Sequence, residues 1–434
     1  MMLFFYIMIL SEKRGEVMKY GLIGEHLSHS FSKEIHEKLA DYTYDLCPLT
    51  KEEFPVFMKQ HDFKAINVTI PYKIDCMAYL DEIDEKAQAI GSVNTIVNRD
   101  GRLYGYNTDY DGFAYMLKRH GVPIQGQKVL MIGDGGAAKA ITKVLKDFHA
   151  KEILKVRRSK SANTISYDEV YQQHMDADII INTSPSGMYP HDDDCPLDLT
   201  AFKDLKYVVD IIYNPLRTSL CVQANNQNVP SIGGLEMLIA QAKVAVEHFL
   251  STSIENHAIH EIYRDMMKEM TSIVLIGMPS SGKSSIGRQL AEDLHKEFYD
   301  VDTQIEQIAK KSIKDIFQDE GEAYFRDLET KVILQLSQKK QAVIATGGGS
   351  ILRKQNVNAL KRNGMLCYIR RDIDKLLVDD ARPLSKSKAA IQEMLDIRAP
   401  LYEAAADICI DNNNDLGTVI EMIKQMFDAY CQKL

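Results

Sequence analysis

The chain has 434 residues, more than one hydrophobic core usually supports, so its length predicts two or three domains. Its 45% hydrophobic and 26% charged residues are those of an ordinary globular protein. The formal net charge of −9 disfavours a polyanion such as nucleic acid as a partner and leaves small anions to local basic patches.

The N-terminal stretch "MMLFFYIMIL" is apolar for only ten residues, whereas a membrane-spanning helix needs roughly 20. It has no leading positive charge and runs into "SEKRGEV", so it resembles no complete signal peptide. We therefore expect no membrane partner. We expect residues 1–17 to be a non-native or disordered extension and Met18 to be the natural start.

From Met18 onward, short apolar strands alternate with amphipathic helices, which predicts an α/β fold with parallel, buried strands. The expected strands are "YGLIG", "AINVTI", "KVLMIG", "EILKV", "DIIINT", "YVVDII", "SIVLIG", "QAVIATGGG" and "MLCYIR". No glycine or proline occurs between Gly234 and Gly277, so we expect a helical linker at residues 251–271 and a second module from Ser272.

Three stretches of the first module carry more small polar residues than strand ends require. They are "SHSFSKEIH" (28–36), "NVTIPYK" (67–73) and "GSVNTIVNRDGRLYGYNTDYDGF" (91–113). Taken singly, Lys73 could be a surface lysine and Asp109 an Asx-turn residue. Their interpretation depends on the segments that follow.

A glycine-rich turn, "GDGGAAK", follows the apolar "KVLMI" and precedes a helix. Gly133, Gly135 and Ala138 fill the G-x-G-x-x-G/A pattern, in which glycines let the backbone approach a pyrophosphate at a helix N-terminus. The next strand ends in "KVRRSKS" instead of the acidic residue of an NAD site, which favours the 2′-phosphate of NADP. A turn that binds nothing, followed by a solvated charge run, is the alternative.

These blocks are followed by "NTSPSGM" (182–188), "DIIYNPLRT" (210–218) and "GGLEMLIAQA" (233–242). In this order they resemble shikimate dehydrogenase over roughly residues 18–250. The resemblance implies a substrate-binding domain at 18–107 and 233–250 and a Rossmann-type NADP-binding domain at 108–232. Lys33 departs from the family pattern, which usually has proline after the second serine, and this changes the stiffness of the loop.

The resemblance also implies roles for individual residues. Lys73 and Asp109 become the catalytic pair, because a positioned ammonium can stabilise and protonate the alkoxide that hydride transfer creates. The implied substrate-binding residues are Ser30 and Ser32 at the carboxylate, Asn67, Thr69, Asn94 and Gln241 at the ring hydroxyls, and Tyr213 at the nicotinamide side. The implied NADP-binding residues are Gly133, Gly135, Gly136, Ala137, Ala138, Arg157, Arg158, Ser159 and Met237.

The second module opens on "GMPSSGKS", which fits G-x-x-x-x-G-K-[ST], follows the strand "SIVLI" and begins a helix. Backbone N–H groups of such a loop enclose phosphates, the lysine reaches the terminal phosphates and the final serine binds Mg²⁺. A loop without nucleotide is the alternative. The expected ATP-binding residues are Gly277, Ser280, Ser281, Gly282, Lys283, Ser284 and Ser285.

The rest of the module contributes acidic and basic groups. In "FYDVD", Asp300 and Asp302 occupy alternate positions at a strand end. Arg326, a third glycine turn and two further arginines follow. The arrangement resembles shikimate kinase, a P-loop nucleoside-monophosphate-kinase-like domain, over residues 272–434.

That resemblance implies that Lys283 and Asp302 are catalytic, with Asp302 orienting the attacking hydroxyl. Asp300 and Ser284 would serve Mg²⁺, and the guanidinium groups of Arg326 and Arg398 would grip a carboxylate in bidentate geometry. Further implied residues are Gly347, Gly348 and Gly349 beside the ring and Arg382 in a lid over ATP.

Together the modules predict a bifunctional enzyme that reduces 3-dehydroshikimate with NADPH and phosphorylates shikimate with ATP. A quinate/shikimate-type dehydrogenase fused to another polyol kinase is one alternative, and a nucleotide-responsive regulator is a second. The seven cysteines show no CxxC pair, which is typical of a reducing compartment, so we expect a cytoplasmic protein.

Overall fold

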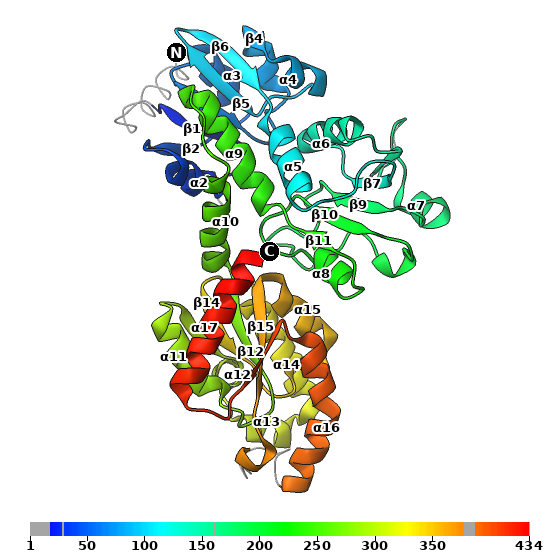
Figure 1. The fold of residues 1–434 in the computed structure, drawn as a ribbon, viewed down its shortest axis with the longest axis vertical. Coiled ribbons are helices and arrows are strands. Elements are labelled where there is room, and N and C mark those ends of the chain that lie inside the picture. Colours follow the sequence, from blue (N-terminus) through cyan, green and yellow to red (C-terminus); the bar gives the residue numbers. More distant parts are fainter. Residues whose placement is uncertain (1–17, 28–29, 160–161, 377–386, 434) are drawn as a thin grey trace. The chain divides into compact units, whose positions relative to one another are not determined.

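The computed structural model describes residues 18–27, 30–159, 162–376 and 387–433 (Figure 1). The predicted extension at 1–17 and Arg382 lie outside this part of the chain. Residue contacts form two compact units. Unit 1 comprises Met1–Pro185, Thr200–Ile211 and Gly234–Tyr263, and unit 2 comprises Ser186–Leu199, Ile212–Gly233 and Arg264–Leu434.

The first sheet of unit 1 has six strands in the order β2-β1-β3-β5-β6-β4. The strands are β1 (Tyr20–Gly24), β2 (Tyr44–Pro48), β3 (Ala65–Val68), β4 (Glu82–Ile83), β5 (Thr95–Arg99) and β6 (Arg102–Tyr106). Strand β5, which is not among the expected strands, is antiparallel to β3 and β6, so this sheet is mixed instead of parallel throughout. Asp100 and Gly101 both have positive φ, and such a two-residue turn reverses the chain into a hairpin.

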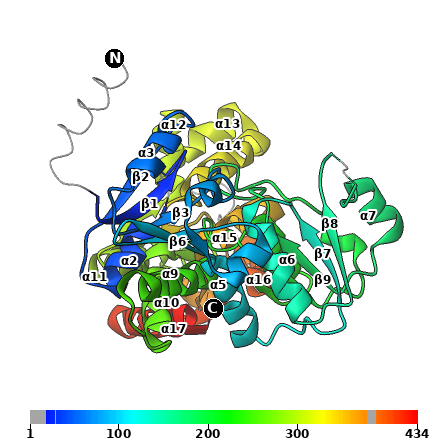
Figure 2. The same ribbon diagram turned by 90° about the horizontal axis from the view of Figure 1, so that it is seen from above.

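Helices cover this sheet and carry several of the predicted site residues. They are α2 (Ser32–Leu39), α3 (Glu53–Gln60), η1 (Asp75–Tyr79), α4 (Glu85–Ile90), α5 (Thr108–Arg119) and α9 (Leu235–Leu250). Helices α5 and α9 lie side by side in Figures 1 and 2. They approach closely because Gly112 of α5 has no side chain: a Cβ there would lie 2.6 Å from the backbone oxygen of Met237.

In the second sheet of unit 1, β10, β9, β7 and β8 are parallel neighbours in that order. Their bounds are β7 (Lys128–Ile132), β8 (Glu152–Val156), β9 (Ile179–Asn182) and β10 (Tyr207–Asp210), with α6 (Gly136–Asp147) and α7 (Tyr167–Gln173) between them. All residues of β9 are buried, as expected for a strand with helices on both faces. The strands predicted here are confirmed.

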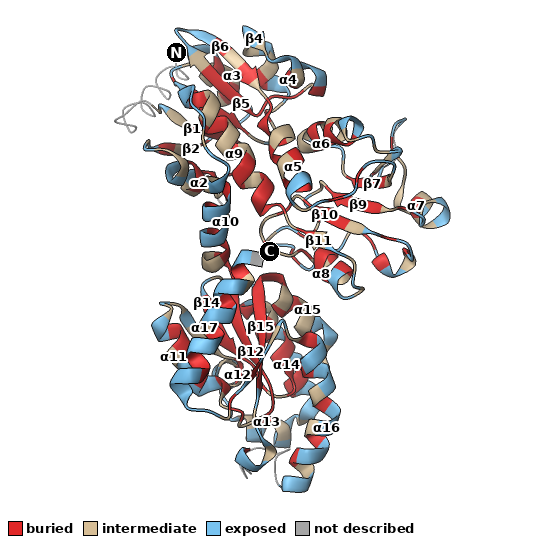
Figure 3. Cartoon of the chain, viewed as in Figure 1, coloured by how far each residue is buried: buried red, intermediate tan, exposed pale blue. Residues whose placement is uncertain are grey.

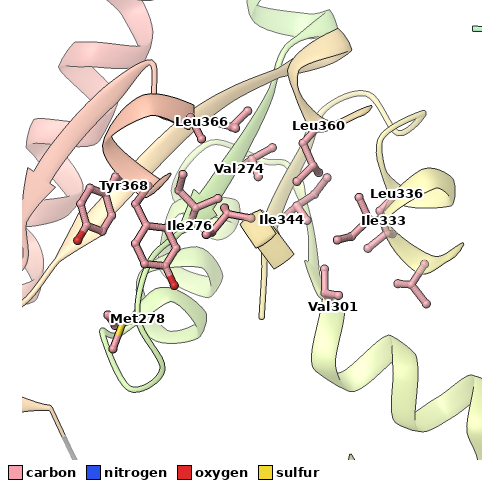
Figure 4. Packing of buried hydrophobic residues seen from close by; sticks show 14 of the residues in the cluster. Val274, Ile276, Met278, Val301, Ile333, Leu336, Ile344, Leu360, Leu366 and Tyr368 are labelled. Atoms are coloured by element: carbon pink, nitrogen blue, oxygen red, sulfur yellow. The ribbon is translucent and has the colours of Figure 1, made fainter. Parts of the chain in front are cut away.

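Unit 2 is built on a parallel sheet of order β13-β14-β12-β15-β16. These strands are β12 (Ser272–Ile276), β13 (Glu297–Asp300), β14 (Ala342–Ala345), β15 (Gly364–Arg370) and β16 (Ile408–Asp411). Val274 of β12 is the register partner of Ile344 on β14 and of Leu366 on β15. All three belong to the buried apolar cluster of Figure 4. The three strands predicted for this module are thereby confirmed.

The helices of unit 2 pack around that sheet, with buried residues on their inner faces (Figure 3). They are α11 (Lys283–Asp293), α12 (Val301–Ala309), α13 (Ile313–Asp319), α14 (Gly321–Leu336), η3 (Ser350–Leu352), α15 (Lys354–Asn363), η4 (Ile373–Lys375), α16 (Lys388–Ala405) and α17 (Leu416–Lys433). The segment Ile212–Gly233 adds α8 (Ser219–Asn225) and β11 (Ser231–Ile232), and η2 spans Leu199–Ala201. Among the described helices, none has the length and apolar character needed to cross a membrane.

The segment predicted as a helical linker, residues 251–271, is helical only in part. Helix α9 ends at Leu250 because Ser251 takes a left-handed conformation with φ of 51°. Residues 251–256 are not helical, and α10 (His257–Met270) forms the remainder. The boundary between the two compact units falls inside α10, between Tyr263 and Arg264.

Candidate active sites

Lys73 and Asp109 meet in unit 1, although 36 residues separate them in the chain. Lys73 lies in the loop after β3, and its Nζ is 2.5 Å from Oδ2 of Asp109. Asp109 is in the first turn of α5, where the helix dipole favours a negative charge, and Asn107 caps that helix. Both side chains are largely shielded from solvent, so the ion pair is less screened than one on the surface.

Asn94, directly before β5, holds the other oxygen of that carboxylate. Its Nδ2 donates to Asp109 Oδ1 at 2.9 Å, and its Oδ1 accepts from the backbone N–H of Thr108 at 2.8 Å. Gln241 of α9 accepts from the Thr108 hydroxyl at 3.1 Å. The structure therefore brings these predicted residues into one hydrogen-bonded set, and the Lys73–Asp109 pair is part of it.

Asn67, Ser30, Ser32 and Thr69 are the remaining predicted substrate-binding residues of this domain. Asn67, buried in β3, donates through Nδ2 to the backbone oxygen of Asn94 at 3.2 Å. Ser30 and Ser32 join each other through a 3.0 Å hydrogen bond between their hydroxyls, at the start of α2. Thr69 packs against Gly24, where a Cβ would lie 2.9 Å from Cδ2 of Leu27.

The glycine-rich turn lies beside Lys73 of the Lys73–Asp109 pair. Gly133 has φ of 104°, a conformation that favours glycine, and a Cβ there would be 2.8 Å from Thr183 Oγ1. Gly135 precedes α6 as its N-cap, and Gly136 begins the helix. A Cβ on Gly136 would lie 3.3 Å from Cδ of Lys73. A dinucleotide on this turn would thus be bound next to the lysine.

The basic residues follow β8 at the same sheet edge. The N–H of Gly133 donates to the carbonyl of Val156, which places the ends of β7 and β8 together. Arg157, Arg158 and Ser159 come next and are exposed. Ala137 and the buried Ala138 occupy the first turn of α6. These positions suit the predicted 2′-phosphate contact, which stays a prediction.

Two further residues of the predicted set lie on other elements. The backbone oxygen of Met237 and Cβ of Gln241 on α9 both lie close to Gly112 of α5, and the roles of these two side chains stay predictions. Tyr213 lies in the segment Ile212–Gly233 of unit 2, and burial raises the pKa of its hydroxyl. Its assignment to the nicotinamide side stays a prediction.

The P-loop of unit 2 has the expected conformation. Gly277 and Gly282 have φ of 146° and 94°, and Lys283 begins α11. Lys283 Nζ donates to the backbone oxygens of Gly277 at 3.0 Å and Met278 at 2.8 Å, so the lysine lies within the loop. Ser280 also has positive φ, at 63°, Ser281 is fully buried, and Ser285 is exposed on α11.

The side-chain oxygens of Ser284 and Asp300 lie next to each other. The Ser284 hydroxyl donates to Asp300 Oδ2 at 2.6 Å. Asp300 is the last residue of β13, at a strand end as predicted. It caps α12 by accepting from the N–H of Thr303 at 3.2 Å, and Asp302 lies in the first helical turn.

The glycine turn after β14 is surrounded by the predicted kinase residues. A Cβ on Gly347 would lie 2.8 Å from Asp302 Oδ1 and 2.9 Å from Glu329 Oε1. A Cβ on Gly348 would lie 2.6 Å from Cδ of Pro279 in the P-loop. The turn therefore joins the P-loop to the acidic residue expected to orient the attacking hydroxyl.

The two predicted arginines reach the same turn. A Cβ on Gly349 would lie 2.5 Å from Cζ of Arg326, and Arg398 Nη1 donates to the backbone oxygen of Gly348 at 3.1 Å. Burial opposes the charge of Arg326, but Glu329 and Glu322 outweigh burial and raise its pKa. A guanidinium that stays charged in a shielded position suits the recognition of a carboxylate.

Several residues of these sites were not predicted. Glu329 is fully buried, accepts from Arg326 Nη1 at 2.9 Å and accepts from the Ser350 hydroxyl at 2.6 Å. Glu329 follows Arg326 by three residues on α14, and residues at this spacing are neighbours on a helix. The sequence could therefore have indicated the contact. Tyr402, whose hydroxyl donates to the Gly348 carbonyl, and Thr108 had no comparable signal.

Comparison with known proteins gives the family. Residues 22–96 match the family described as shikimate dehydrogenase substrate binding domain, and residues 279–428 match shikimate kinase. The shikimate dehydrogenase (NADP(+)) of Clostridium beijerinckii is 40% identical over 259 residues, covering 56% of this chain and 96% of that protein. The chain belongs to the shikimate dehydrogenase family. Its C-terminal part is a shikimate kinase domain, so both predicted resemblances are confirmed.

Solved structures agree with the shikimate dehydrogenase assignment. A chorismate mutase/shikimate 5-dehydrogenase fusion protein from Clostridium acetobutylicum is 36% identical, with a TM-score of 0.54, and the match covers 58% of this chain and 97% of that one. The shikimate 5-dehydrogenase from Thermus thermophilus in complex with NADP(H) and shikimate is 25% identical, with a TM-score of 0.51, 56% of this chain and 97% of that one being covered. The predicted fold class is confirmed.

Proposed function

We propose that this chain catalyses two consecutive reactions: NADPH-dependent reduction of 3-dehydroshikimate to shikimate, and ATP-dependent phosphorylation of shikimate to shikimate 3-phosphate. One observation carries the proposal: the same chain holds a Lys73–Asp109 pair beside a dinucleotide turn and a P-loop joined to an arginine-lined glycine turn. The product of the first reaction is the acceptor in the second.

In the dehydrogenase reaction, Lys73 supplies the proton. Bound NADPH supplies the hydride to the carbonyl carbon. Lys73 Nζ stabilises the negative charge that develops on the carbonyl oxygen and donates a proton to it, and in the reverse direction it accepts that proton. Asp109 keeps the ammonium in place through the 2.5 Å contact, and Asn94 keeps Asp109 in place.

The substrate and the cofactor are held by residues around this pair. The paired hydroxyls of Ser30 and Ser32 bind the substrate carboxylate, and the buried amides bind ring hydroxyls. The turn at Gly133 to Ala138 fits a pyrophosphate, because a side chain at Gly133 would fill the space beside Thr183. Arg157 and Arg158 bind the 2′-phosphate of NADP.

In the kinase reaction, Asp302 orients the 3-hydroxyl of shikimate and accepts its proton during attack on the γ-phosphate. Lys283 neutralises charge on the transferring phosphoryl group. Arg326 and Arg398 hold the shikimate carboxylate, each from one side of the glycine turn. Arg382 belongs to the segment that we expect to cover ATP, outside the described residues.

Mg²⁺ is proposed for the kinase site. Among the described residues, no group of three or more His, Cys, Asp or Glu side chains is arranged to hold a metal. Mg²⁺ needs few protein ligands when phosphates supply the others, and the 2.6 Å pair of Ser284 and Asp300 offers a hydroxyl and a carboxylate oxygen. The bound ion would shield the charge of the phosphates, with Asp300 acting through a water molecule.

Analysis of products tests both activities at once. The purified chain is incubated with 3-dehydroshikimate, NADPH, ATP and Mg²⁺, and products are identified by mass spectrometry, with one cofactor omitted in each control. Shikimate 3-phosphate should form only when both cofactors are present. Accumulation of unphosphorylated shikimate in the full mixture would contradict the kinase assignment, and no shikimate would contradict the dehydrogenase assignment.

The proposed location is the cytoplasm. All seven cysteines are free thiols, which fits a reducing compartment. Burial raises the pKa of Cys76 to about 12, so this thiol, three residues after Lys73, stays protonated at neutral pH.

A further inference from the structure

A buried tyrosine outside the predicted site lies against Asn67. Tyr44, the first residue of β2, is 0% exposed, and its hydroxyl donates a 2.7 Å hydrogen bond to Asn67 Oδ1. The two residues are 23 positions apart in the chain, and no sequence motif includes Tyr44. The contact nevertheless determines what Asn67 can offer to a ligand.

The two polar atoms of the Asn67 amide are distinguished by their neighbours. Nδ2 lies 3.2 Å from the backbone oxygen of Asn94 and 3.0 Å from Oγ1 of Thr95. A carbonyl oxygen accepts hydrogen bonds and donates none, so the atom that faces it must be the NH2 group. Oδ1 therefore faces Tyr44, and both amide protons are used within the protein.

The same amide begins a chain of buried hydrogen bonds. Asn67 donates to Thr95 Oγ1, and Thr95 Oγ1 donates to Asn94 Oδ1 at 3.0 Å. Asn94 in turn donates to the carboxylate of Asp109 at 2.9 Å. The Tyr44 hydroxyl is the first member of this series of hydrogen bonds, and the proposed catalytic pair is at the other end. In a buried network each bond is worth more, and each unpaired group costs more, than in water.

Helix α2 holds Tyr44 through both of its backbone groups. The N–H of Tyr44 donates to Glu37 Oε1 at 3.0 Å, and its carbonyl accepts from Lys33 Nζ at 2.9 Å. The imidazole of His36 stacks on the Tyr44 ring with centroids 4.0 Å apart.

We infer that Tyr44 is a positioning residue for the dehydrogenase reaction and acts through Asn67. Its hydroxyl fixes the amide so that Asn67 presents an acceptor, the second lone pair of Oδ1, to a substrate hydroxyl. A ring hydroxyl that donates a hydrogen bond is then favoured over a carbonyl at this point of the substrate. The inference rests on the proposed function, which assigns Asn67 to the substrate.

The first test is Tyr44→Phe in the full-length chain, which removes only the hydroxyl. We expect kcat/KM for shikimate oxidation to fall by about 10- to 30-fold, mainly through KM, while KM for NADP+ changes less than about twofold. Tyr42→Phe is the matched control, because the Tyr42 hydroxyl pairs with His36 Nδ1 at 2.7 Å instead of with Asn67. This control should behave as the wild type.

The second test is a double-mutant cycle. In an Asn67→Ala background, Tyr44→Phe should change kcat/KM by less than about twofold, because the amide that the Tyr44 hydroxyl holds in the wild type is absent. Independent, multiplicative effects of the two changes would overturn the inference. So would an unchanged KM for shikimate in Tyr44→Phe, or an equal rise of KM for NADP+. A wild-type chain that does not oxidise shikimate would instead overturn the proposed function.

Discussion

Replacing Gly349 with alanine tests the Arg326 clamp without altering the arginine. A Cβ at position 349 would lie 2.5 Å from Cζ of Arg326. The backbone of Gly349 has φ of −100° and ψ of −1°, which alanine can adopt, so backbone strain is not the cause of any effect. The steric contact acts on the guanidinium, which must move.

The displacement can be estimated from ordinary contact distances. Non-bonded heavy atoms are most stable about 3.5 to 4.0 Å apart, so the guanidinium must retreat by about 1 Å. That movement breaks the 2.9 Å bond from Arg326 to the buried Glu329 and removes a charge-assisted partner from the substrate carboxylate. Such a loss amounts to about 2 to 3 kcal/mol, which corresponds to a roughly 30- to 140-fold increase in KM for shikimate.

The assay is steady-state kinase activity with either substrate varied. KM for shikimate should rise as estimated, KM for ATP should stay within about twofold, and dehydrogenase activity of the same preparation should be unchanged. Gly417→Ala in α17 is the matched control, since the nearest atom to a Cβ there is Asp415 Oδ1 at 3.3 Å. A wild-type KM for shikimate in Gly349→Ala would refute the assignment of Arg326 to the carboxylate.

Three further predictions concern Gly347, Gly112 and His36. Gly347→Ala places a Cβ 2.8 Å from Asp302 Oδ1, so it should lower kcat of the kinase at least tenfold, and a wild-type kcat would contradict the role of Asp302. Gly112→Ala places a Cβ 2.8 Å from Cβ of Gln241. The free energy of unfolding, measured by thermal unfolding, should therefore fall by about 1 to 3 kcal/mol, and the dehydrogenase KM for shikimate should rise. Burial lowers the pKa of His36 to about 3, so the unfolded chain binds the extra proton below its ordinary pKa of 6.5. The free energy of unfolding should therefore fall by up to about 1.4 kcal/mol per pH unit from 6.5 down to 3, and His36→Phe should lack this slope in acid titrations.

Much of the fold could be predicted because apolar runs mark buried strands directly. The strand containing Val274 has apolar residues at most positions and is buried throughout, as a central parallel strand requires. The direction of β5 was not predicted, because it depends on the conformation of the Asp100–Gly101 turn rather than on apolar periodicity. Asp300 lies at a strand end as predicted, but its capping bond to Thr303 was not predicted, because that bond depends on the helix α12 that begins directly after it.

The candidate sites were predictable where one motif contains the chemistry. The P-loop and the dinucleotide turn specify backbone conformations, so Gly277 and Gly133 could be identified from spacing alone. Tyr44 could not, because its importance depends on a contact between two strands that are distant in sequence. Contacts of this kind require the tertiary structure, since nothing local to Tyr44 distinguishes it from an ordinary core tyrosine.

The close packing of Gly348 against Pro279 has a thermodynamic consequence. The two residues belong to the loops proposed for shikimate and for ATP. Because Gly348 has no side chain, the loops lie so close together that a Cβ there would be 2.6 Å from Cδ of Pro279, and little room is left for one loop to shift alone. If the occupied form of one loop favours the occupied form of the other, the affinity for each ligand depends on the presence of its partner. Linkage requires the same coupling free energy in both directions. The kinase would then bind its two substrates as a cooperative pair.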